Sequence, residues 1–586
     1  MSGKLYGDKM NRRNFMGKVV LGGSTIASAS LTGLPAHAHQ NQKSVSINES
    51  GKILKADLII AGGGLGGCAA AFAALRNGLT VVMTEETDWL GGQLSQQGVP
   101  PDEHQWIETH GAPELYRIFR EKVREFYKRY YPLTPEAAAN DRLNPGGGSV
   151  SRLCLEPRVG HMVLEEMFVA YESSRKLIVL KNHKVDSAKV TGTKVQALTA
   201  ENLLTKQMVL LEGDYFVDAT ELGDLLPLTG TAYITGSEAR GDTGELHAGS
   251  RHRPENNQAF TMCFAIDYVK GEDWTIPKPE DYDFWRNFTP KMDPPWAGKM
   301  LELNYSNPKD LKPKELGFHP EGIRTGNKLN LMVYRKIIDQ GNHQPGFYQG
   351  DATIVNWPQN DYVSGNIVDV SEAEFQKHVN GGKQQSLSLL YWLQTEAPRP
   401  DGGKGWSGLR LRNDLMGTED GLAKYPYIRE ARRIKALFTV LEEHVGASQR
   451  AAVSGLEGKA LKAADFYDSV GVGYYHIDLH PSSSGDNYID FGSLPFQIPL
   501  GALIPQQTEN LLPANKNIGT THITNGCYRL HPVEWSIGEA VGMLVPFALG
   551  KKVRPQTVRE DISLLNEFQS FIRSQGIETE WPEFNE

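Results

Sequence analysis

The sequence predicts an α/β protein in which a domain built on a parallel sheet is interleaved with an α+β domain. Three observations support this prediction. Residues 57–85 combine two apolar strands, a glycine loop and a helix in the order of a βαβ unit. Residues 214–223 and 509–549 supply further apolar strands and a last apolar helix that can extend the same sheet. Residues 240–500 are rich in Trp, Tyr, Pro, Asn and charge, which indicates a separate, irregular domain.

Three glycines follow the first strand at the spacing of a dinucleotide-binding loop. Gly62, Gly64 and Gly67 satisfy GxGxxG, and residues 69–76 after them are strong helix formers. Gly62 permits the tight turn, Gly64 lets the backbone approach a diphosphate, and Gly67 lets the helix pack near the strand. The helix N-terminus can then stabilise the phosphate charge. The alternative interpretation is a glycine-lined turn within a core.

The second strand of this unit, over residues 80–84, ends in two acids. Glu85 comes directly after the strand, where an acceptor for a ribose hydroxyl is expected, and Glu86 follows it. We favour Glu85 because it is the first acid. The complete unit, known as a Rossmann-like fold, predicts nucleotide binding.

Composition excludes several classes of function. The 586-residue chain carries a net charge of −9 without a long basic run, so no nucleic-acid partner is expected. Its four cysteines are widely spaced and form no CxxC pair, so neither a zinc knuckle nor a dithiol redox centre is supported. No metal site is predicted.

The N-terminus predicts export. Arg12, Arg13 and Phe15 resemble a twin-arginine signature, and a weakly apolar run and a small-x-small site at residues 36–38 follow. We therefore interpret residues 1–38 as a signal peptide and expect a periplasmic or secreted protein. The run is too short and polar for a stable membrane span. The alternative is a disordered basic tail.

Motifs later in the sequence distinguish between FAD and NAD as the cofactor. Gly91, Gly92 and Gln93 stand in TDWLGGQLSQQG shortly after the ribose acid, and Asp218 stands in DYFVDATELG at a strand end. Together with the glycine loop, these motifs resemble the FAD-dependent oxidoreductase family. The resemblance extends to the FAD subunit of heterodisulfide reductase and to glutathione-reductase-type two-domain flavoproteins. It covers about residues 56–550, including SRLCLEPRVGHMVLEEM, TGSE and YIREARRI.

The resemblance implies FAD as the cofactor and a last helix that opens at residues 537–540 with its N-terminus toward the flavin. It also implies that the strand near Val185 offers backbone to the adenine. The implied FAD contacts are Gly62, Gly64, Leu65, Gly67, Glu85, Gly91, Gly92, Gln93, Val185, Asp218, Ala219, Thr220, Gly538 and Glu539. The sequence lacks the cysteine pair and cluster cysteines that disulfide reduction or an iron–sulfur relay would need.

The same reading predicts the domain organisation. The predicted segments are a linker over 39–55, a FAD-binding domain over 56–240 with a β-meander insert at about 177–212, a substrate domain over 241–500, a second FAD-binding part over 501–552 and a helical tail over 553–586. In the substrate domain, helices are expected at 372–379, 384–395 and 428–444. Its tryptophans either stack on flat substrates or fill an irregular core.

Two stretches could supply proton-transfer groups. In GYYHIDLHP, a strand would place Tyr474, His476, Asp478 and His480 on one face. In THITNGCYRLHPVE, just before the last helix, the titratable and basic side chains include His522, Arg529 and His531. We select four catalytic candidates, which are His522, His531, Arg529 and His476. The alternatives are a solvated strand face and structural hydrogen bonding.

The predicted function is flavin-mediated hydride transfer from a hydroxyl- or amine-bearing carbon of a small polar substrate, such as a carbohydrate. The electron acceptor could be oxygen, a quinone or a redox protein. One alternative is a fumarate-reductase-like reductase of an activated double bond, with Arg529 as proton donor. Another is a non-catalytic binding protein that retains FAD as a structural element.

Overall fold

The structure, a computed structural model, describes residues 43–48, 52–324 and 326–583. The predicted signal peptide lies outside these residues. Residues 43–586 form a separate unit from residues 1–42, and only the former is considered below.

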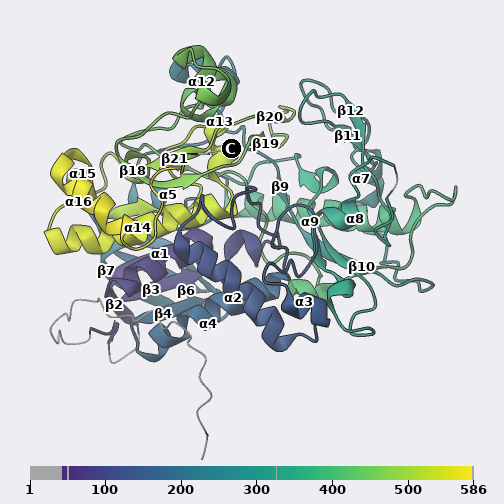
Figure 1. Ribbon diagram of the computed structural model, residues 1–586, viewed down its shortest axis with the longest axis horizontal. Helices are drawn as coiled ribbons and strands as arrows, with labels where there is room; N and C mark the ends of the chain where they lie inside the picture. Colours follow the sequence, from purple (N-terminus) through teal and green to yellow (C-terminus); the bar gives the residue numbers. More distant parts are fainter. Residues whose placement is uncertain (1–42, 49–51, 325, 584–586) are drawn as a thin grey trace, which may run out of the picture. The chain divides into compact units, whose positions relative to one another are not determined.

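A mixed sheet of eight strands forms the half of this unit that carries the glycine loop (Figure 1). The strand order is β4-β3-β2-β7-β6-β5, with β1 beside β2 and β22 beside β7. Neighbours among β2, β3, β4, β7 and β22 run parallel, whereas β5, β6 and β7 form an antiparallel meander. These strands are β1 (Ser46–Ile47), β2 (Ile53–Ala61), β3 (Val81–Glu85), β4 (Leu177–Lys181), β5 (His183–Thr191), β6 (Lys194–Asn202), β7 (Met208–Asp218) and β22 (Leu511–Pro513). The α/β fold class is therefore confirmed.

The predicted βαβ unit is present, with shifted boundaries. β2 starts at Ile53, inside the predicted linker, because its first residues already pair with β7. α1 (Leu65–Arg76) starts directly after Gly64 and is buried along almost its whole length. The strand predicted within the meander at residues 177–181 is β4, which instead extends the parallel sheet beside β3.

α1 packs most extensively against α14 (His531–Lys551). The prediction that this helix opens at residues 537–540 is wrong, because it begins six residues earlier. Pro532 in the first turn is well suited to a helix start, since its missing N–H needs no partner there. Gly538 therefore lies inside the helix, where it packs on Gly66.

The other half contains a four-stranded antiparallel sheet in the order β13-β14-β10-β16. The helices predicted at 372–379 and 384–395 are one continuous helix, α9 (Glu372–Thr395). The helix predicted at 428–444 is absent, because this segment is extended through β17 (Arg433–Ile434), which pairs with β8 (Tyr233–Ile234), and turns helical only in α11 (Glu442–Val445). Residues 240–500 contain six tryptophans, and all but Trp274 are buried. They fill the core.

The remaining elements complete the described chain. The helices are α2 (Glu114–Tyr130), α3 (Pro135–Ala139), α4 (Pro157–Ser173), α5 (Leu225–Thr229), α6 (Arg240–Thr243), α7 (Tyr282–Asn287), α8 (Leu331–Tyr334), α10 (Asn413–Met416), α12 (Ala447–Ser454), α13 (His522–Tyr528), α15 (Pro555–Glu560) and α16 (Ile562–Arg573). The strands are β9 (Phe260–Thr261), β10 (Phe264–Tyr268), β11 (Asn304–Ser306), β12 (Pro313–Glu315), β13 (Lys336–Ile338), β14 (Ala352–Val355), β15 (Asp361–Tyr362), β16 (Leu409–Leu411), β18 (Ser469–Gly473), β19 (Ile477–Leu479), β20 (Ile489–Phe491) and β21 (Phe496–Pro499). The 3₁₀ helices are η1 (Gly92–Leu94), η2 (Gln340–Asn342), η3 (Pro358–Asn360), η4 (Gly458–Ala460) and η5 (Leu500–Leu503).

None of the helices described combines the length and the apolar character that crossing a bilayer requires.

Candidate functional site

A cavity opens at the carboxyl ends of β2, β3 and β7. Its volume is about 440 Å³, part of which is open to solvent. Ligands of parallel α/β sheets bind at such strand ends. The residues that line it are Gly62, Gly64, Thr84, Glu85, Glu86, Gln96, Gln97, His183, Val185, Ala219, Thr220, Glu221 and Tyr425. Six of the predicted FAD contacts are among them, drawn from four separate segments of the chain.

The glycine loop has the backbone geometry that close approach to a ligand requires. Gly62 has a φ of +99°, and a Cβ there would lie 2.2 Å from the Ala219 carbonyl oxygen. Gln97 adds a buried side-chain amide nitrogen that has no hydrogen-bond partner in the part of the chain described. A tight glycine turn and an unpaired donor at one cavity fit a dinucleotide.

The two acids after β3 have different partners. Glu85 is buried and engaged, because its Oε2 accepts from Gly63 N at 3.0 Å and its Oε1 from Thr87 N at 2.8 Å. Burial raises the pKa of Glu85 to about 7 and that of Glu86 to about 8. Glu86 has an ion-pair contact of 4.0 Å to Lys184 Nζ and is a quarter exposed. Glu86 is therefore the acid with more capacity left for a ribose hydroxyl.

The segment after β7 contributes backbone and leaves its acid occupied. Ala219 and Thr220 line the cavity, whereas the Asp218 carboxylate accepts hydrogen bonds from Thr220 N, Thr220 Oγ1 and Leu225 N at 2.7–3.1 Å. Burial raises the pKa of Asp218 to about 7. Asp218 thus shapes the loop, while Val185 of β5 lines the cavity.

A carboxylate already occupies part of the α1 N-terminus. Glu534 Oε1 accepts from Gly66 N at 3.1 Å, and its Oε2 lies 3.9 Å from Lys516 Nζ. The same Lys516 Nζ lies 2.5 Å from Glu221 Oε2. Burial raises the pKa of Glu534, and Lys516 opposes that shift. A diphosphate at the N-terminus of α1 would therefore lie beside the Glu534 carboxylate. The glycine pattern did not predict this carboxylate.

The WLGGQ loop folds directly against the glycine loop. Gly91 N donates to Gly63 O at 2.8 Å, and a Cβ on Gly92 would lie 2.9 Å from Gly64 Cα. Gln93 in η1 donates from Nε2 to the Arg529 carbonyl at 2.8 Å and also contacts Glu534. The predicted contacts in this loop therefore connect the cavity to the segment before α14.

The remaining predicted FAD contacts lie in helices. Leu65 and Gly67 are buried in the first turn of α1, where Gly67 packs on Gly62. Gly538 and Glu539 lie in the interior of α14 and do not line the cavity. Glu539 Oε2 accepts from Trp535 Nε1 at 2.9 Å. The expectation that they stand at a helix N-terminus is thus corrected, because the helix starts at His531.

A buried charge cluster lies beyond Gln93. Its members are Asp102, Arg335, Tyr427, Tyr475, Asp478 and Arg529. Arg335 Nη1 lies 3.3 Å from Asp102 Oδ1, and Arg529 Nη2 lies 3.3 Å from Asp478 Oδ2, while Arg529 Nη1 donates to the Tyr427 hydroxyl at 3.1 Å. Both arginines keep a buried Nε without a partner among the described residues. Two loosely paired cations with unused donors can receive polar substrate groups.

This cluster joins the two stretches that the sequence singled out. Asp478 comes from GYYHIDLHP and Arg529 from the segment before α14. The predicted row of alternating side chains is only partly formed, since β19 spans Ile477–Leu479 alone. The two stretches nevertheless contact each other, because Asp478 of the first pairs with Arg529 of the second.

His531 borders the cluster but is fully engaged. Its Nδ1 accepts from Asp102 N at 3.1 Å, and its Nε2 lies 3.2 Å from Val99 O. Burial lowers the pKa of His531 to about 4, so the imidazole is neutral at pH 7. These contacts favour a structural role that fixes Asp102.

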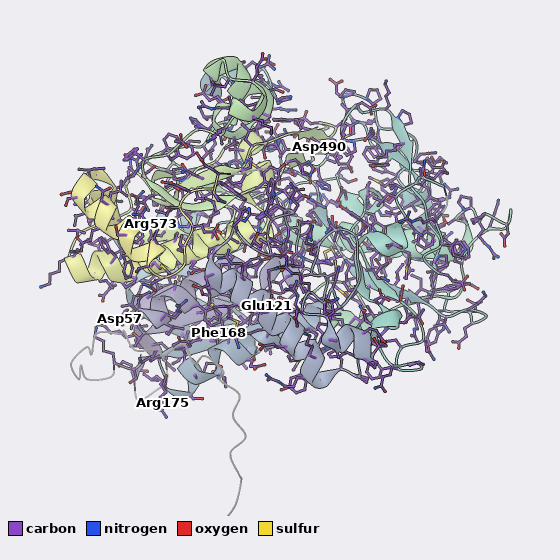
Figure 2. The ribbon with its side chains drawn as sticks, viewed as in Figure 1. Asp57, Glu121, Phe168, Arg175, Asp490 and Arg573 are labelled. Atoms are coloured by element: carbon purple, nitrogen blue, oxygen red, sulfur yellow. The ribbon has the colours of Figure 1, made fainter. Side chains whose placement is uncertain are left out.

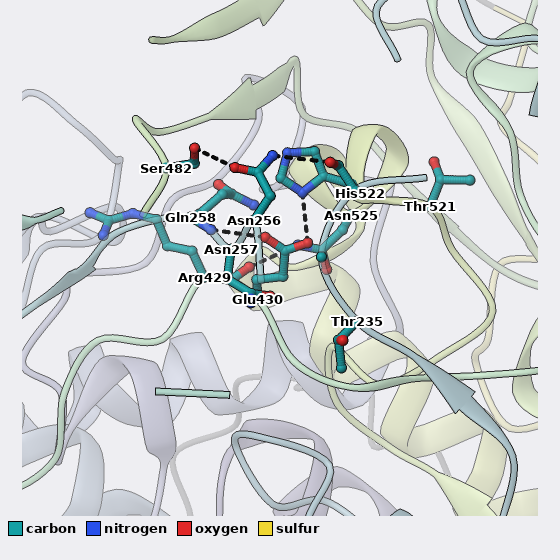
Figure 3. A network of polar contacts seen from close by, with 12 residues as sticks. Thr235, Asn256, Asn257, Gln258, Arg429, Glu430, Ser482, Thr521, His522 and Asn525 are labelled. Atoms are coloured by element: carbon teal, nitrogen blue, oxygen red, sulfur yellow. Dashed lines mark hydrogen bonds and ion pairs between the residues drawn. The ribbon is translucent and has the colours of Figure 1, made fainter. Parts of the chain in front are cut away.

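His522 lies in a different network (Figure 3). Its Nδ1 lies 2.7 Å from Glu430 Oε1, and Arg433 Nη1 lies 2.8 Å from that same oxygen. Burial alone would lower the pKa of His522, but Glu430 outweighs it and raises the pKa. In YIREARRI, Arg433 therefore pairs with Glu430, although the helix predicted over this segment is absent. Among the described residues, the polar contacts of His522 are with Glu238 and Glu430, which lie outside the charge cluster.

His476 lines a second, open cavity of about 1090 Å³. Its Nδ1 lies 2.5 Å from Oδ1 of Asp490, which is labelled in Figure 2. Burial would lower the pKa of His476, but Asp490 outweighs it and raises the pKa. The lining residues are Glu103, His104, Lys309, Tyr474, Tyr475, His476, Asp490, Phe491 and Gly492. Tyr475 belongs to this lining and to the charge cluster, so the cavity leads toward the cluster.

Sequence reasoning missed Asp102, Arg335 and Tyr427. Asp102 and Arg335 are 233 residues apart and meet only in the folded chain. No local spacing signals such a pair. Glu86 was noticed and ranked second, and its neighbour's backbone contacts could be seen only in the structure.

Comparison with known proteins gives the family. A family model described as FAD dependent oxidoreductase matches residues 57–572. No curated protein sequence matches the chain significantly.

Several solved structures resemble parts of the chain. They include L-proline dehydrogenase from P. horikoshii (14% identity, 33% of this chain, 26% of that chain, TM-score 0.17). The flavin-dependent monooxygenase PieE, solved with FAD and substrate, matches at 15% identity over 36% of this chain and 35% of that one, with a TM-score of 0.20. Glycerol-3-phosphate dehydrogenase from Bacillus halodurans, solved with FAD, matches at 14% identity over 36% and 40%, with a TM-score of 0.22. The chain spans less than half the length of each.

The match over residues 57–572 covers most of the chain, and the geometry of the Gly62 loop suits the same cofactor. The chain therefore belongs to the FAD-dependent oxidoreductase family and is an enzyme with FAD as its cofactor.

Proposed function

We propose that this enzyme takes a hydride from a hydroxyl- or amine-bearing carbon of a small polar organic substrate. FAD supplies the hydride acceptor when it is bound. The chain must then bind and orient the substrate and receive its proton. The observation that carries this proposal is the position of the charge cluster, next to the Gln93 loop that the family resemblance implies contacts FAD.

The residues proposed to hold the cofactor are those of the first cavity. Gly62, Gly64, Ala219 and Thr220 offer backbone, and Val185 offers the edge of β5. Glu86 is the proposed partner of the ribose. In this proposal, the Gln93 loop and the charge cluster lie toward the flavin end of the cofactor.

The charge cluster suits a substrate with hydroxyl, amine or carboxyl groups. Arg335 and Arg529 provide donors, Asp102 and Asp478 provide acceptors, and the hydroxyl of Tyr427 can provide either. The open cavity at Tyr474 and His476 offers an approach. Its aromatic rings and polar groups fit a sugar or another flat polar compound.

A second candidate is reduction of an activated double bond. Arg529 favours it, because its buried guanidinium lies in the cluster with an unpartnered Nε. In that case Arg529 would donate a proton to the substrate while FAD, reduced beforehand, supplied the hydride. The two candidates require opposite redox states of the enzyme.

Flavin absorbance tests both candidates. The purified protein is expected to show a flavin spectrum, and acid precipitation then reveals whether the flavin is covalently bound. Under anaerobic conditions, alcohols or amines from a panel are expected to bleach the oxidised flavin. Re-oxidation of dithionite-reduced enzyme by activated alkenes, without bleaching by any alcohol or amine, would favour the second candidate.

A variant pair connects the activity to the cluster. Arg529→Gln is expected to slow bleaching about 100-fold while the flavin content is kept, because one buried donor is lost. Arg251→Gln, at an exposed arginine, serves as the matched control. Equal bleaching rates in both variants would count against a role of the cluster.

We also propose export by the twin-arginine pathway to the periplasm or medium. Residues 1–38 lie outside the described residues, so this rests on their sequence. Arg12→Lys together with Arg13→Lys is expected to retain the FAD-loaded protein in the cytoplasm. Kinship with the FAD subunit of heterodisulfide reductase is likewise inferred from sequence segments alone. The electron acceptor stays open among oxygen, a quinone and a redox protein.

A further inference from the structure

Residues 423–428, which we call the strap, connect the half of the molecule that contains β10 with the first cavity. Backbone hydrogen bonds attach the strap to that half: Ala423 N donates to Cys263 O at 2.7 Å, and Tyr427 N donates to Thr261 O at 2.8 Å. Between these two bonds, Tyr425 lines the cavity beside the glycine loop. The strap therefore supplies part of the cavity wall from the half of the molecule that lacks the glycine loop.

Lys424 fixes the strap in front of Gly91–Gln93, the residues that the family resemblance implies contact FAD. Its Nζ lies 2.8 Å from Asp88 Oδ1 and 4.6 Å from the centre of the Trp89 ring. The same Nζ donates to the Gly417 carbonyl at 2.7 Å. An ion pair combined with a cation–π contact is a stronger attachment than an exposed ion pair alone. All these partners are protein groups, so the attachment acts with or without a bound cofactor.

Two glutamines attach the strap on the other side of Gly91–Gln93. Tyr425 N donates to Gln96 O at 3.3 Å, and Ile428 N donates to Gln97 Oε1 at 3.3 Å. Because the Gln97 oxygen is held by Ile428, its Nε2 is left as the free end of the amide. That nitrogen is buried and has no hydrogen-bond partner among the described residues, and Gln97 lines the cavity. The strap therefore orients an unpaired donor at the cavity.

The Tyr425 hydroxyl is a second donor at the cavity. Burial raises the pKa of Tyr425 well above its usual value, and the nearby carboxylates of Glu86 and Asp224 raise the pKa further. The hydroxyl therefore keeps its proton at neutral pH and can donate a hydrogen bond to a phosphate or hydroxyl oxygen. A dinucleotide carries many such oxygens, so these two donors suit FAD.

We propose that the strap closes over bound FAD, that the Tyr425 hydroxyl and the Gln97 amide are additional cofactor contacts, and that Lys424 controls how fast FAD binds and leaves. Because the strap is attached on both sides of Gly91–Gln93, a cofactor that lies against those residues leaves only after these attachments break. Lys424 is thus a positioning residue. The inference concerns the cofactor alone and does not depend on the substrate proposed above.

The rates of FAD exchange test this inference. The change in flavin fluorescence follows release after dilution of the holoenzyme and association after FAD is added to the apoprotein. Lys424→Met keeps the chain length but removes the charge. It should speed up both association and release about tenfold and leave the Kd nearly unchanged, because the attachment is lost with and without the cofactor. Tyr425→Phe should speed up release alone, by about fivefold, because it removes a contact with the cofactor itself.

Lys278→Met is the matched control. Lys278 Nζ also combines an ion pair, 2.7 Å from Asp283 Oδ2, with a cation–π contact, 5.6 Å from the centre of the Tyr282 ring. None of these three residues lines the first cavity, so both rates should stay as they are.

Two results would overturn the role of Lys424: original rates in Lys424→Met, or faster release without faster association. An original release rate in Tyr425→Phe would overturn the contact assigned to its hydroxyl. Flavin that stays on the acid-precipitated protein would overturn the whole inference, because a covalently bound cofactor is not released. Bleaching by alcohols or amines, scored on the same preparations, decides the proposed function separately.

Discussion

At the scale of single residues, the two acids after β3 make different predictions. Glu86→Gln should weaken FAD binding about tenfold, because an amide replaces the carboxyl group that is the proposed partner of a ribose hydroxyl. Glu85→Gln should instead lower the thermal midpoint, since Glu85 holds Gly63 N and Thr87 N at 3.0 and 2.8 Å. FAD titration of the apoprotein by flavin fluorescence and thermal unfolding measure the two effects.

The two variants serve as controls for each other. Glu86→Gln leaves the Gly63 and Thr87 contacts in place, so its apoprotein should unfold near the original temperature. An unchanged FAD affinity in Glu86→Gln, with a large loss in a folded Glu85→Gln, would restore the assignment made from sequence order.

Residue-level prediction from sequence depends on local signals. The spacing of Gly62 and Gly64 places them in the cavity because the turn, the strand end and the helix start are consecutive in the chain. It did not find Arg335, whose partner Asp102 is 233 residues away. Sequence order also ranked Glu85 before Glu86 as the ribose acceptor. In the structure, the hydrogen bonds that already occupy Glu85 distinguish the two acids.

At the scale of elements, α1 and α14 make the most extensive helix–helix contact in the described part of the chain. A Cβ at position 538 would lie 2.0 Å from the Gly66 carbonyl oxygen, so Gly538→Ala must push two buried helices apart. We expect a loss of about 2–4 kcal/mol in the free energy of unfolding and a lower flavin content, since α1 carries the glycine loop. Denaturant unfolding and the flavin absorbance ratio measure both.

Gly550→Ala is the matched control on the same helix. A Cβ there would meet nothing within 4 Å. Because Ala stabilises a helix by about 1 kcal/mol relative to Gly, this variant should be as stable as the original or more so. Similar losses in both variants would show that helix propensity, and not the α1 contact, dominates.

Element prediction was good for the βαβ unit and poor for the segment over 427–434. Tyr427–Ile434 has helix-forming residues, yet it is extended because distant partners satisfy it. Arg429 reaches Asp361, and Arg433 bonds Glu238 and the carbonyl of Gly236. The pairing of β17 with β8 also holds this segment in an extended conformation. Tertiary contacts of this kind override local propensity, and one sequence does not display them.

At the scale of the whole molecule, several buried acidic side chains remain partly protonated at neutral pH. Burial raises the pKa of Glu85, Asp218, Glu245 and Glu539 to about 7. The same groups in the unfolded chain ionise near pH 4. At pH 6 the folded protein therefore binds protons that the unfolded chain has already released, and the four acids occur in separate segments of the chain.

The stability of the apoprotein should consequently fall as the pH rises from 6 to 8. An acid with a raised pKa contributes stability that is fully present below its unfolded pKa and is lost as the pH passes its folded pKa. Each of these four acids accounts for roughly 1 kcal/mol over this range, and Glu86, whose pKa burial raises to about 8, adds roughly 2 kcal/mol, so the free energy of unfolding should fall by roughly 5–7 kcal/mol in total. His104, His161 and His531, whose pKa values burial lowers to about 4, act in the opposite direction only below about pH 6.5.

Urea unfolding of the apoprotein at intervals between pH 6 and 8 measures this decline. Glu539→Gln keeps an acceptor for Trp535 Nε1 but cannot ionise, so it should reduce the decline by roughly 1 kcal/mol. Glu419→Gln, at an exposed acid, should leave the slope as it is. A free energy of unfolding that stays constant or increases across this range would mean that the buried acids are ionised in the folded protein. The cavity beside Gly62 would then carry the full negative charge of Glu85. At neutral pH this charge would repel a diphosphate bound there.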